Sequence, residues 1–262
     1  MSEIELLLEV MRRLRDPERG CPWDVAQTFE TIAPYTLEEA FEVADAIERG
    51  DLEALHEELG DLLFQVVFHA RMAEEQGAFD FASVAGGLAD KMRRRHPHVF
   101  GSAEIADAAA QTTAWESHKA SERSARGEGV LDGVPVALPA LARAQKLGRR
   151  AARVGFDWPE ARGVLAKLAE EARELEEAVA ARATRPEAVE EELGDLLFTI
   201  ANLARHLEVD AEGALRRASL KFERRFRAME ERLAAAGRRP EEAGPDELER
   251  LWNEAKESAP GR

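Results

Sequence analysis

The heptapeptide ELGDLLF occupies residues 58–64 and recurs unchanged at residues 192–198. Three further motifs accompany it in the same order in both halves of the chain. Glu-Glu-x-x-Glu begins at residues 38 and 170, Lys-x-x-x-Arg begins at residues 91 and 221, and Trp-x-x-x-Lys begins at residues 115 and 252. An ordered set of motifs that appears twice predicts a duplicated domain rather than a short solenoid repeat.

The segment between the two copies is rich in Ser, Gly and Pro, which favours a linker. We expect an N-terminal domain over residues 1–120, a linker over residues 121–139 and a C-terminal domain over residues 140–262. Each domain is then close to the common domain size.

The composition favours helix almost everywhere, because Ala, Leu, Glu and Arg dominate and there is a single Tyr. Apolar residues recur at helical spacing at Leu37, Phe41, Ala44 and Ile47, and again from Leu55 to Val67, with Asp51 as the expected N-cap of the second helix. The matching helices are expected at residues 167–182 and 186–207, with Pro186 in a first turn. The predicted fold is all-α, with two tandem helical-bundle domains built from a duplicated four-helix unit.

The formal net charge of −16 argues against a nucleic-acid polymer as partner, because phosphate backbones are bound by basic surfaces. No stretch approaches the roughly 20 apolar residues of a membrane-spanning helix. Cys21 is the only cysteine, which excludes an intrachain disulfide. We expect a cytoplasmic protein that does not enter the membrane.

Acidic side chains in both copies are spaced to share helix faces. Residues three apart lie about 60° apart around a helix, so each motif presents a carboxylate pair, and two antiparallel helices bring two pairs together. Oxygen-only sites of this kind suit Mg²⁺, with Mn²⁺ as a substitute. The candidate metal ligands are Glu39, Glu42, Glu58 and Asp61 in the first copy and Glu171, Glu174, Glu192 and Asp195 in the second.

A lone Glu-Glu-x-x-Glu is usually a solvated helix face, and only its recurrence in register with the apolar stripes favours metal. The pairs Lys91/Arg95 and Lys221/Arg225 each lie on one helical face and suit phosphate. Taken alone, Lys221 and Arg225 would be assigned to an ordinary charged helix. The same holds for Trp252, which either stacks on a base or anchors a helix.

Six segments together closely resemble the MazG family of nucleoside triphosphate pyrophosphohydrolases. They are GCPWD at residues 20–24, EEAFE at 38–42, ELGD at 58–61, HPHVFG at 96–101, ARVGFDW at 152–158 and KFERRF at 221–226. The resemblance covers nearly the whole chain and is weakest in the linker.

This resemblance implies hydrolysis of nucleoside triphosphates to the monophosphate and pyrophosphate, with Mg²⁺, by a homodimer. It implies that Glu171, Glu174, Glu192 and Asp195 bind the metal, with Glu170 and Glu191 in supporting roles. The residues implied to bind the triphosphate and nucleoside are Lys167, Lys221, Arg225, Trp252 and Lys256. A dimer also agrees with a physical expectation, since the apolar face of a small helix pair often needs a partner to cover it.

The two copies differ at positions that matter for phosphate. Tyr35 stands where the second copy has Lys167, and Glu116 stands where it has Asn253. Losing a cation and gaining an acid both weaken a grip on phosphate, so we expect the C-terminal copy to be the main catalytic domain. Water activated by bound cations then attacks phosphorus, and Glu170 or Glu191 takes its proton. The spacing does not reveal which phosphorus is attacked.

Two other classes of protein fit parts of the sequence. Glu53-x-x-His56 is an element of carboxylate-bridged di-iron bundles, but the second copy has Glu187-x-x-Glu190 instead, which disfavours a duplicated di-iron protein. A helical scaffold or regulatory dimer without hydrolase activity is the other alternative. It predicts no hydrolysis with any metal.

Overall fold

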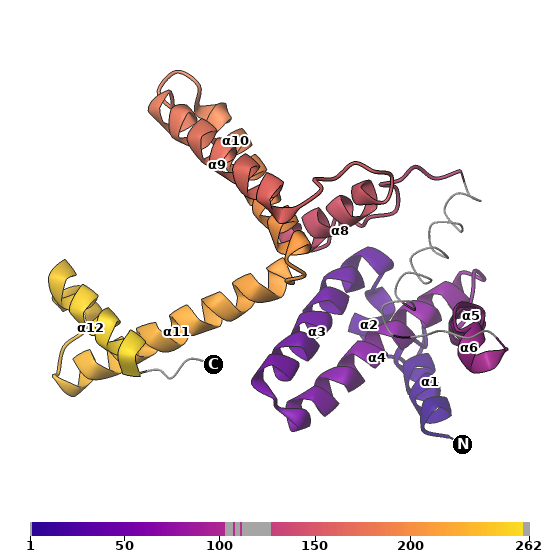
Figure 1. Cartoon of the computed structure of the whole chain (residues 1–262). Coiled ribbons are helices and arrows are strands. Elements are labelled where there is room, and N and C mark those ends of the chain that lie inside the picture. The colour runs from indigo at the N-terminus through magenta and orange to yellow at the C-terminus, as the bar shows by residue number, and fades with distance from the viewer. Residues whose placement is uncertain (1, 103–106, 108–110, 112–126, 259–262) are drawn as a thin grey trace. The chain divides into compact units, whose positions relative to one another are not determined.

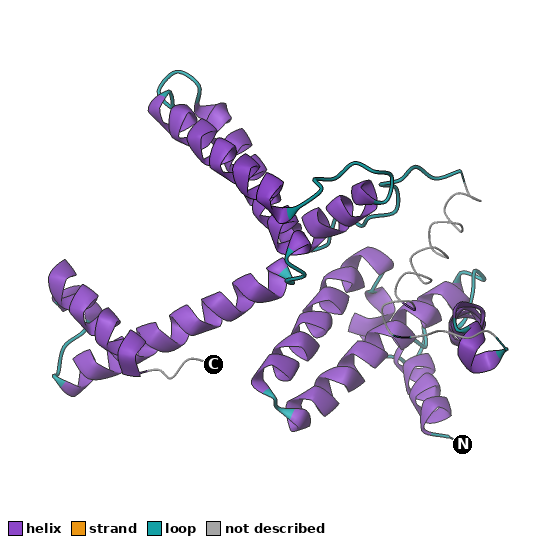
Figure 2. Cartoon of the chain, viewed as in Figure 1, coloured by secondary structure: helices purple, strands orange, loops and turns teal. Residues whose placement is uncertain are grey.

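The structure is a computed structural model that describes residues 2–102, 107, 111 and 127–258 (Figure 1). The described residues form helices joined by turns and loops and include no β-strand, which confirms the all-α prediction (Figure 2). The chain divides into two compact units, Met1–Ala120 and Ser121–Arg262. Part of the expected linker lies outside the described residues.

The first unit is organised around a long helical hairpin, α3 (Phe29–Arg49) and α4 (Leu52–Glu75), whose two helices lie side by side. The shorter helices α1 (Glu3–Leu14) and α5 (Phe81–Arg95) contact α4. The remaining described helices are α2 (Pro22–Ala26) and α6 (Pro97–Phe100).

The turn between α3 and α4 is set by two consecutive residues. Gly50 ends α3 with a φ of 68°, a left-handed conformation that favours glycine. The side chain of Asp51 then accepts a hydrogen bond from the backbone N–H of Ala54 at 3.1 Å, which confirms the predicted N-cap of α4. The two helices are therefore antiparallel neighbours.

The core of the first unit lies where α1 meets the hairpin. Its fully buried side chains are Met11, Ile32, Val67, Phe68 and Met72. The nearly buried guanidinium of Arg15 donates to Glu75 at 2.7 Å and lies 5.3 Å from the centre of the Phe68 ring. This core fixes the half of α4 farthest from the turn, and so sets the direction of the hairpin.

The second unit repeats the hairpin with α9 (Ala161–Ala180) and α10 (Pro186–His206). Helix α8 (Ala140–Ala152) packs against α10. Helix α11 (Ala211–Ala235) leaves the end of this hairpin and packs mainly against α12 (Pro245–Ser258), with the short 3₁₀ turn Pro240–Glu242 between them (Figure 1).

The second hairpin shows where helix boundaries were predicted well and poorly. Pro186 occupies the first turn of α10, as predicted, because its missing N–H needs no partner there. Helix α9 begins at Ala161, earlier than the predicted residue 167, and its first turns include the buried Val164. It also ends at Ala180, two residues before the predicted end.

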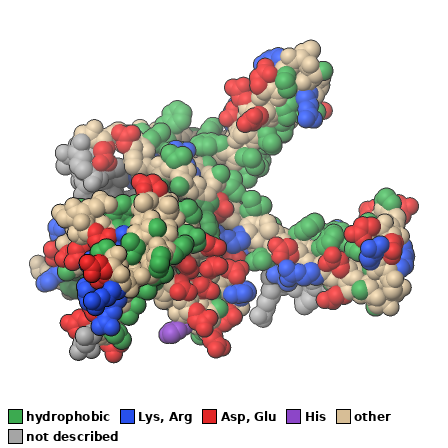
Figure 3. Space-filling model, turned by 180° about the vertical axis from the view of Figure 1, so that it is seen from behind, with side chains coloured by type: hydrophobic (Ala, Val, Ile, Leu, Met, Phe, Trp, Pro, Cys, Tyr) green, Lys and Arg blue, Asp and Glu red, His purple; other side chains and the backbone are tan. Residues whose placement is uncertain are grey.

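The apolar stripes of the hairpins are partly exposed within one chain. In α3, Leu37 is 47% exposed, Phe41 49% and Ile47 60%. In α10, Leu197 is 46% exposed and Phe198 44%. Figure 3 shows hydrophobic side chains at the surface along the projecting α9–α10 hairpin. The periodicity identified the helices correctly, but it did not reveal which apolar faces would remain uncovered.

Candidate metal centre

Three carboxylates of the second unit converge between the helices of its hairpin. Glu171 comes from α9, and Glu192 and Asp195 come from α10, with one oxygen of each lying within 4.8 Å of the others. Residues 192 and 195 are three apart, so both project from the α10 face that meets α9. The arrangement places negative charges close enough to share one cation.

Glu171 is the most buried member of this cluster, with 4% of its surface exposed. Its Oε1 accepts an ion-pair contact from the Nζ of Lys167 at 2.8 Å. Its Oε2 is buried and has no hydrogen-bond partner among the described residues. A buried carboxylate oxygen without a partner is unfavourable, and a divalent cation satisfies it well. The donor set therefore fits Mg²⁺ or Mn²⁺.

The electrostatics of the second cluster also favour a cation. Burial raises the pKa of Glu192, and the negative charges of Glu174 and Glu191 raise it further. Glu174 is thus an electrostatic neighbour of the cluster, although it is not one of the three residues whose oxygens converge. The predicted four-carboxylate site is therefore a close triad with Glu174 at its margin.

The first unit contains the same triad in Glu39 of α3 and Glu58 and Asp61 of α4, again with oxygens within 4.8 Å of one another. Burial raises the pKa of Glu39, and the charges of Asp61 and Glu42 raise it further. Burial likewise raises the pKa of Glu58, with added effects from Glu42 and Asp61. Glu42 therefore corresponds to Glu174 at the margin of its cluster.

The two clusters differ in their counter-ions. Lys167 contacts Glu171 in the second unit, whereas the corresponding position of the first unit holds Tyr35. Tyr35 is half-exposed and meets Trp23 edge to face, with ring centres 6.0 Å apart. No lysine or arginine of the described residues forms an ion pair within 4.0 Å of the Glu39 triad. The first triad therefore has no lysine in contact with it among the described residues, although the charge of Arg49 acts on Glu58 in the direction that lowers its pKa.

The two predicted proton acceptors lie beside the second cluster on different helices. Glu170 on α9 accepts from Lys167 at 2.8 Å, and this hydrogen bond lowers the pKa of Glu170. Glu191 on α10 is exposed and contributes to the raised pKa of Glu192. Sequence reasoning named Lys167 and Glu170 but missed their pairing, which the spacing of three residues would have suggested.

Apart from Lys167, the cationic and aromatic residues of the second unit that were predicted to bind substrate lie away from the acidic hairpin. Lys221 and Arg225 are on α11, which packs mainly against α12 rather than against the acidic hairpin (Figure 1). The Nε of Arg225 is buried and lacks a hydrogen-bond partner among the described residues. The sequence analysis placed this pair beside the metals, and within one chain the structure does not bring them together.

Trp252 and Lys256, which were predicted to bind substrate, form a small aromatic corner with Phe222 between α11 and α12. The ring centres of Phe222 and Trp252 are 5.1 Å apart, and the Nζ of Lys256 lies 5.9 Å from the Trp252 ring centre. Lys256 also donates to the Oδ1 of Asn253 at 3.1 Å. The corner therefore offers an aromatic surface with a cation at its edge.

The corresponding residues of the first unit are described only in part. Lys91 and Arg95 lie near the C-terminal end of α5, where Arg95 is half-buried. Trp115, Glu116 and Lys119, which correspond to Trp252, Asn253 and Lys256, lie outside the described residues. The predicted effect on phosphate binding of having Glu116 in place of Asn253 therefore stays a prediction.

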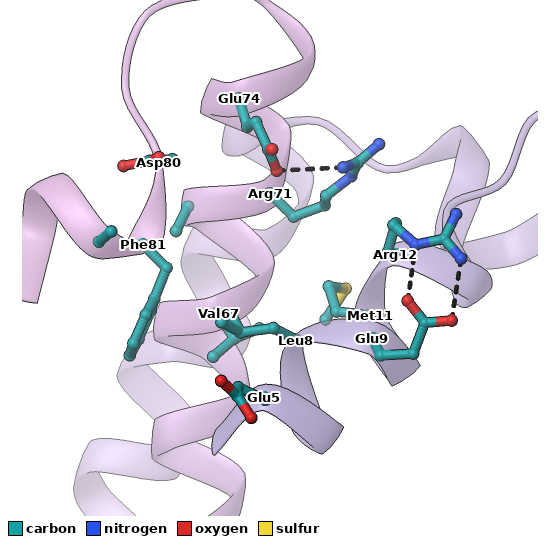
Figure 4. A pocket seen from close by; sticks show the side chains of 12 residues that line it. Glu5, Leu8, Glu9, Met11, Arg12, Val67, Arg71, Glu74, Asp80 and Phe81 are labelled. Carbon is teal, nitrogen blue, oxygen red and sulfur yellow. Dashed lines mark hydrogen bonds and ion pairs between the residues drawn. The ribbon is translucent and has the colours of Figure 1, made fainter. Parts of the chain in front are cut away.

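A cavity of the first unit, about 380 Å³ in volume, lies between α1, α4 and the start of α5, and no residue of that unit's triad lines it (Figure 4). Its two arginines are already paired, Arg12 with Glu9 at 2.7 Å and Arg71 with Glu74 at 3.0 Å. The cavity also has the acids Glu5 and Asp80 in its lining, and none of the predicted site residues lines it.

Two helical hairpins, each with a carboxylate triad whose oxygens lie within 4.8 Å, define an all-α protein with duplicated candidate sites for a divalent cation. The MazG nucleotide pyrophosphohydrolase domain matches residues 27–100 and 160–229, and each match contains one triad. The chain belongs to this family. The recognition made from the sequence motifs is thereby confirmed.

Relatives match the chain over nearly its full length. A nucleoside triphosphate pyrophosphohydrolase of Escherichia coli (strain K12) is 49% identical over 257 residues, which cover 98% of this chain and 98% of the relative. A nucleoside triphosphate pyrophosphohydrolase/pyrophosphatase MazG of Thermotoga maritima is 43% identical, covering 96% and 95%. A crystal structure of a mazG-related protein from Thermotoga maritima is 31% identical with a TM-score of 0.38, covering 44% of this chain and 98% of that chain.

Proposed function

We propose that the protein hydrolyses nucleoside triphosphates to nucleoside monophosphate and pyrophosphate in a metal-dependent reaction carried mainly by the C-terminal unit. The observation that carries this proposal is the Glu171 carboxylate, buried within an acidic triad with one oxygen unpaired. Two relatives of nearly the same length bear the name of this activity, which supports the same reaction class. Nucleoside triphosphates are cytoplasmic metabolites, so we propose that the protein acts in the cytoplasm.

Glu171, Glu192 and Asp195 would hold the cation, with Glu174 completing the site from its margin. A bound Mg²⁺ supplies charge neutralisation for the triphosphate and lowers the pKa of water at the site. Glu170 and Glu191 are the two candidate proton acceptors, and in the structure without substrate the pairing of Glu170 with Lys167 lowers the pKa of Glu170. Mn²⁺ is expected to substitute, since it accepts the same oxygen ligands.

We further propose that the working form is a homodimer. The exposed apolar face of α10 includes Leu193, Leu197 and Phe198, each more than two-fifths exposed, and such a face is stabilised when a partner covers it. A second chain would also be able to bring the cations of α11 to the acidic hairpin, which one chain does not do in this structure. A monomer in light scattering at micromolar concentration would contradict the dimer.

Among the described residues no helix is both long and apolar enough to cross a membrane. The partners we propose are the nucleotide and a second copy of the chain, and the charge of −16 argues against a nucleic-acid polymer.

The test compares matched variants of the two triads, Asp195→Asn and Asp61→Asn, with the wild-type protein. Each is incubated with each nucleoside triphosphate, with and without Mg²⁺, and products are separated by anion exchange. Loss of a metal ligand removes several kcal/mol of transition-state stabilisation, so Asp195→Asn should lower turnover by about a hundredfold or more. Asp61→Asn should stay within about twofold of wild type if the C-terminal unit dominates.

Each other outcome has a definite meaning. A loss of activity in Asp61→Asn alone would transfer the main activity to the first unit. Diphosphate and orthophosphate as products would overturn the cleavage position. No turnover with any metal would support the helical scaffold, and visible absorbance with bound iron would support the di-iron alternative.

A further inference from the structure

Lys167 is held by two acids on its own helix. Its Nζ lies 2.8 Å from an oxygen of Glu170 and 2.8 Å from Oε1 of Glu171. The lysine side chain is 33% exposed, whereas that of Glu171 is 6% exposed. The ammonium therefore approaches from the solvent side and neutralises a carboxylate whose other oxygen faces inward.

This position makes the ammonium a rival of the cation that the triad is suited to hold. Glu171 belongs to the triad, so a divalent cation there and the Lys167 ammonium would share one carboxylate. Two cations on one carboxylate repel each other, and the repulsion is only partly screened beside a buried group. In the absence of substrate, Lys167 must therefore weaken metal binding.

A bound triphosphate reverses the effect of Lys167 on metal binding, because it brings several negative oxygens to the metal. A long, flexible lysine side chain that is one-third exposed can leave Glu170 and Glu171 and turn to those oxygens. The repulsion between ammonium and metal is then offset by their common anionic partner.

The first unit provides a natural comparison. Tyr35 occupies the position of Lys167, three residues before Glu38 and four before Glu39, on the same face of α3. A tyrosine carries no positive charge at neutral pH and cannot oppose metal binding in this way. The two triads thus differ in one respect: a lysine on the same helix forms an ion pair with a triad carboxylate in the second unit, and a tyrosine stands at that position in the first unit.

We propose that Lys167 is a displaceable counter-ion of the C-terminal triad. It opposes the binding of a metal ion alone, and it moves aside when a metal ion and a triphosphate bind together. This proposal rests on the proposed function and adds a form of regulation to it: the site fills with metal efficiently only when substrate is present. The tyrosine-bearing N-terminal triad lacks this coupling.

The proposal predicts that Lys167→Gln changes the metal affinity in opposite directions with and without triphosphate. In the free protein Lys167 opposes the metal, so Lys167→Gln should strengthen metal binding. With the triphosphate bound the ammonium favours the complex, so the same substitution should weaken metal binding. A static structural ion pair would not give opposite effects in the two states.

The experiment measures Mn²⁺ binding to the full chain by electron paramagnetic resonance. Lys167→Gln is made in the Asp61→Asn background, which leaves the C-terminal triad as the intact site, and each titration is run once with free Mn²⁺ and once with the preformed Mn²⁺–triphosphate complex, because free triphosphate in excess would itself chelate the metal. Without triphosphate the Mn²⁺ affinity should rise about threefold to tenfold, and the affinity for the complex should fall by a similar factor. Circular dichroism should show unchanged helicity, since Gln is a good helix former.

The matched control transfers the counter-ion to the first unit. Tyr35→Lys in the Asp195→Asn background should weaken Mn²⁺ binding to the N-terminal triad about threefold without triphosphate. Mn²⁺ bound equally by Lys167→Gln and its parent in both states would overturn the proposal and leave the metal site intact. Absence of Mn²⁺ binding in the parent proteins would instead contradict the proposed function.

Discussion

Replacing Leu197 by Glu is the perturbation that tests most directly whether the open face of α10 is an interface. Leu197 is 46% exposed, so close to half of its side chain remains to be buried by a partner. Complete burial of a leucine stabilises by about 1.5–3 kcal/mol, which leaves about 0.7–1.4 kcal/mol per protomer at this position. A symmetric dimer counts the residue twice, for about 1.5–3 kcal/mol.

The glutamate adds a second penalty, because two carboxylates would be buried at the interface without partners. Their desolvation brings the total above about 3 kcal/mol, which corresponds to at least a hundredfold increase in the dimer dissociation constant. The isolated protomer should keep its fold, since the side chain then remains in water. Its helicity should therefore match that of the wild type.

Sedimentation velocity over a range of concentrations measures this change. Leu52→Glu serves as the control, because Leu52 is also an exposed leucine but lies at the start of α4, outside the proposed α10 interface. The reasoning is refuted if Leu197→Glu and wild type dissociate at the same concentration. It is equally refuted if Leu52→Glu disrupts the dimer to the same extent.

Two further predictions concern stability. Asp51→Ala removes the cap that accepts from Ala54 and should lower the free energy of unfolding of the first unit by about 1 kcal/mol in urea; an unchanged urea midpoint would show that the cap is dispensable. In EDTA, the melting temperature should rise as pH falls from 7 to 5. The folded pKa values of Glu58 and Glu192 lie above the ordinary 4.5, so protonation in that range favours the folded state. The rise should shrink in the double variant Glu58→Gln/Glu192→Gln and disappear in saturating Mg²⁺, whereas equal pH profiles for the double variant and wild type would contradict this account.

Local signals were the part of the fold that sequence predicted best. The start of α4 follows from Asp51 as N-cap, and the start of α10 follows from Pro186, because both effects operate within a single turn. The pairing of the helices within each hairpin followed from short connections between apolar stripes. Two triads were foreseeable for the same reason, since the spacing of their acids fixes the helix face.

What the sequence could not predict depends on long-range packing. Periodicity shows that Leu37 and Phe41 share a helix face, but it does not show whether the same chain covers that face. The path of α11 away from the acidic hairpin, which separates Lys221 from Glu171 within one chain, is likewise set by tertiary contacts rather than by motif order. The unpaired Oε2 of Glu171 also required coordinates, because it depends on the orientation of a buried side chain.

The two hairpins join their helices through connections of different length, and each hairpin still brings together an equivalent triad of acids. Gly50 and Asp51 join α3 to α4, whereas residues 181–185 join α9 to α10. The length of the connection is therefore free to vary, while an insertion within a helix would rotate every following residue by about 100° and separate the acids. The loop at residues 181–185 is thus a suitable position for a fluorophore or a peptide tag that reports on the nearby triad without altering it.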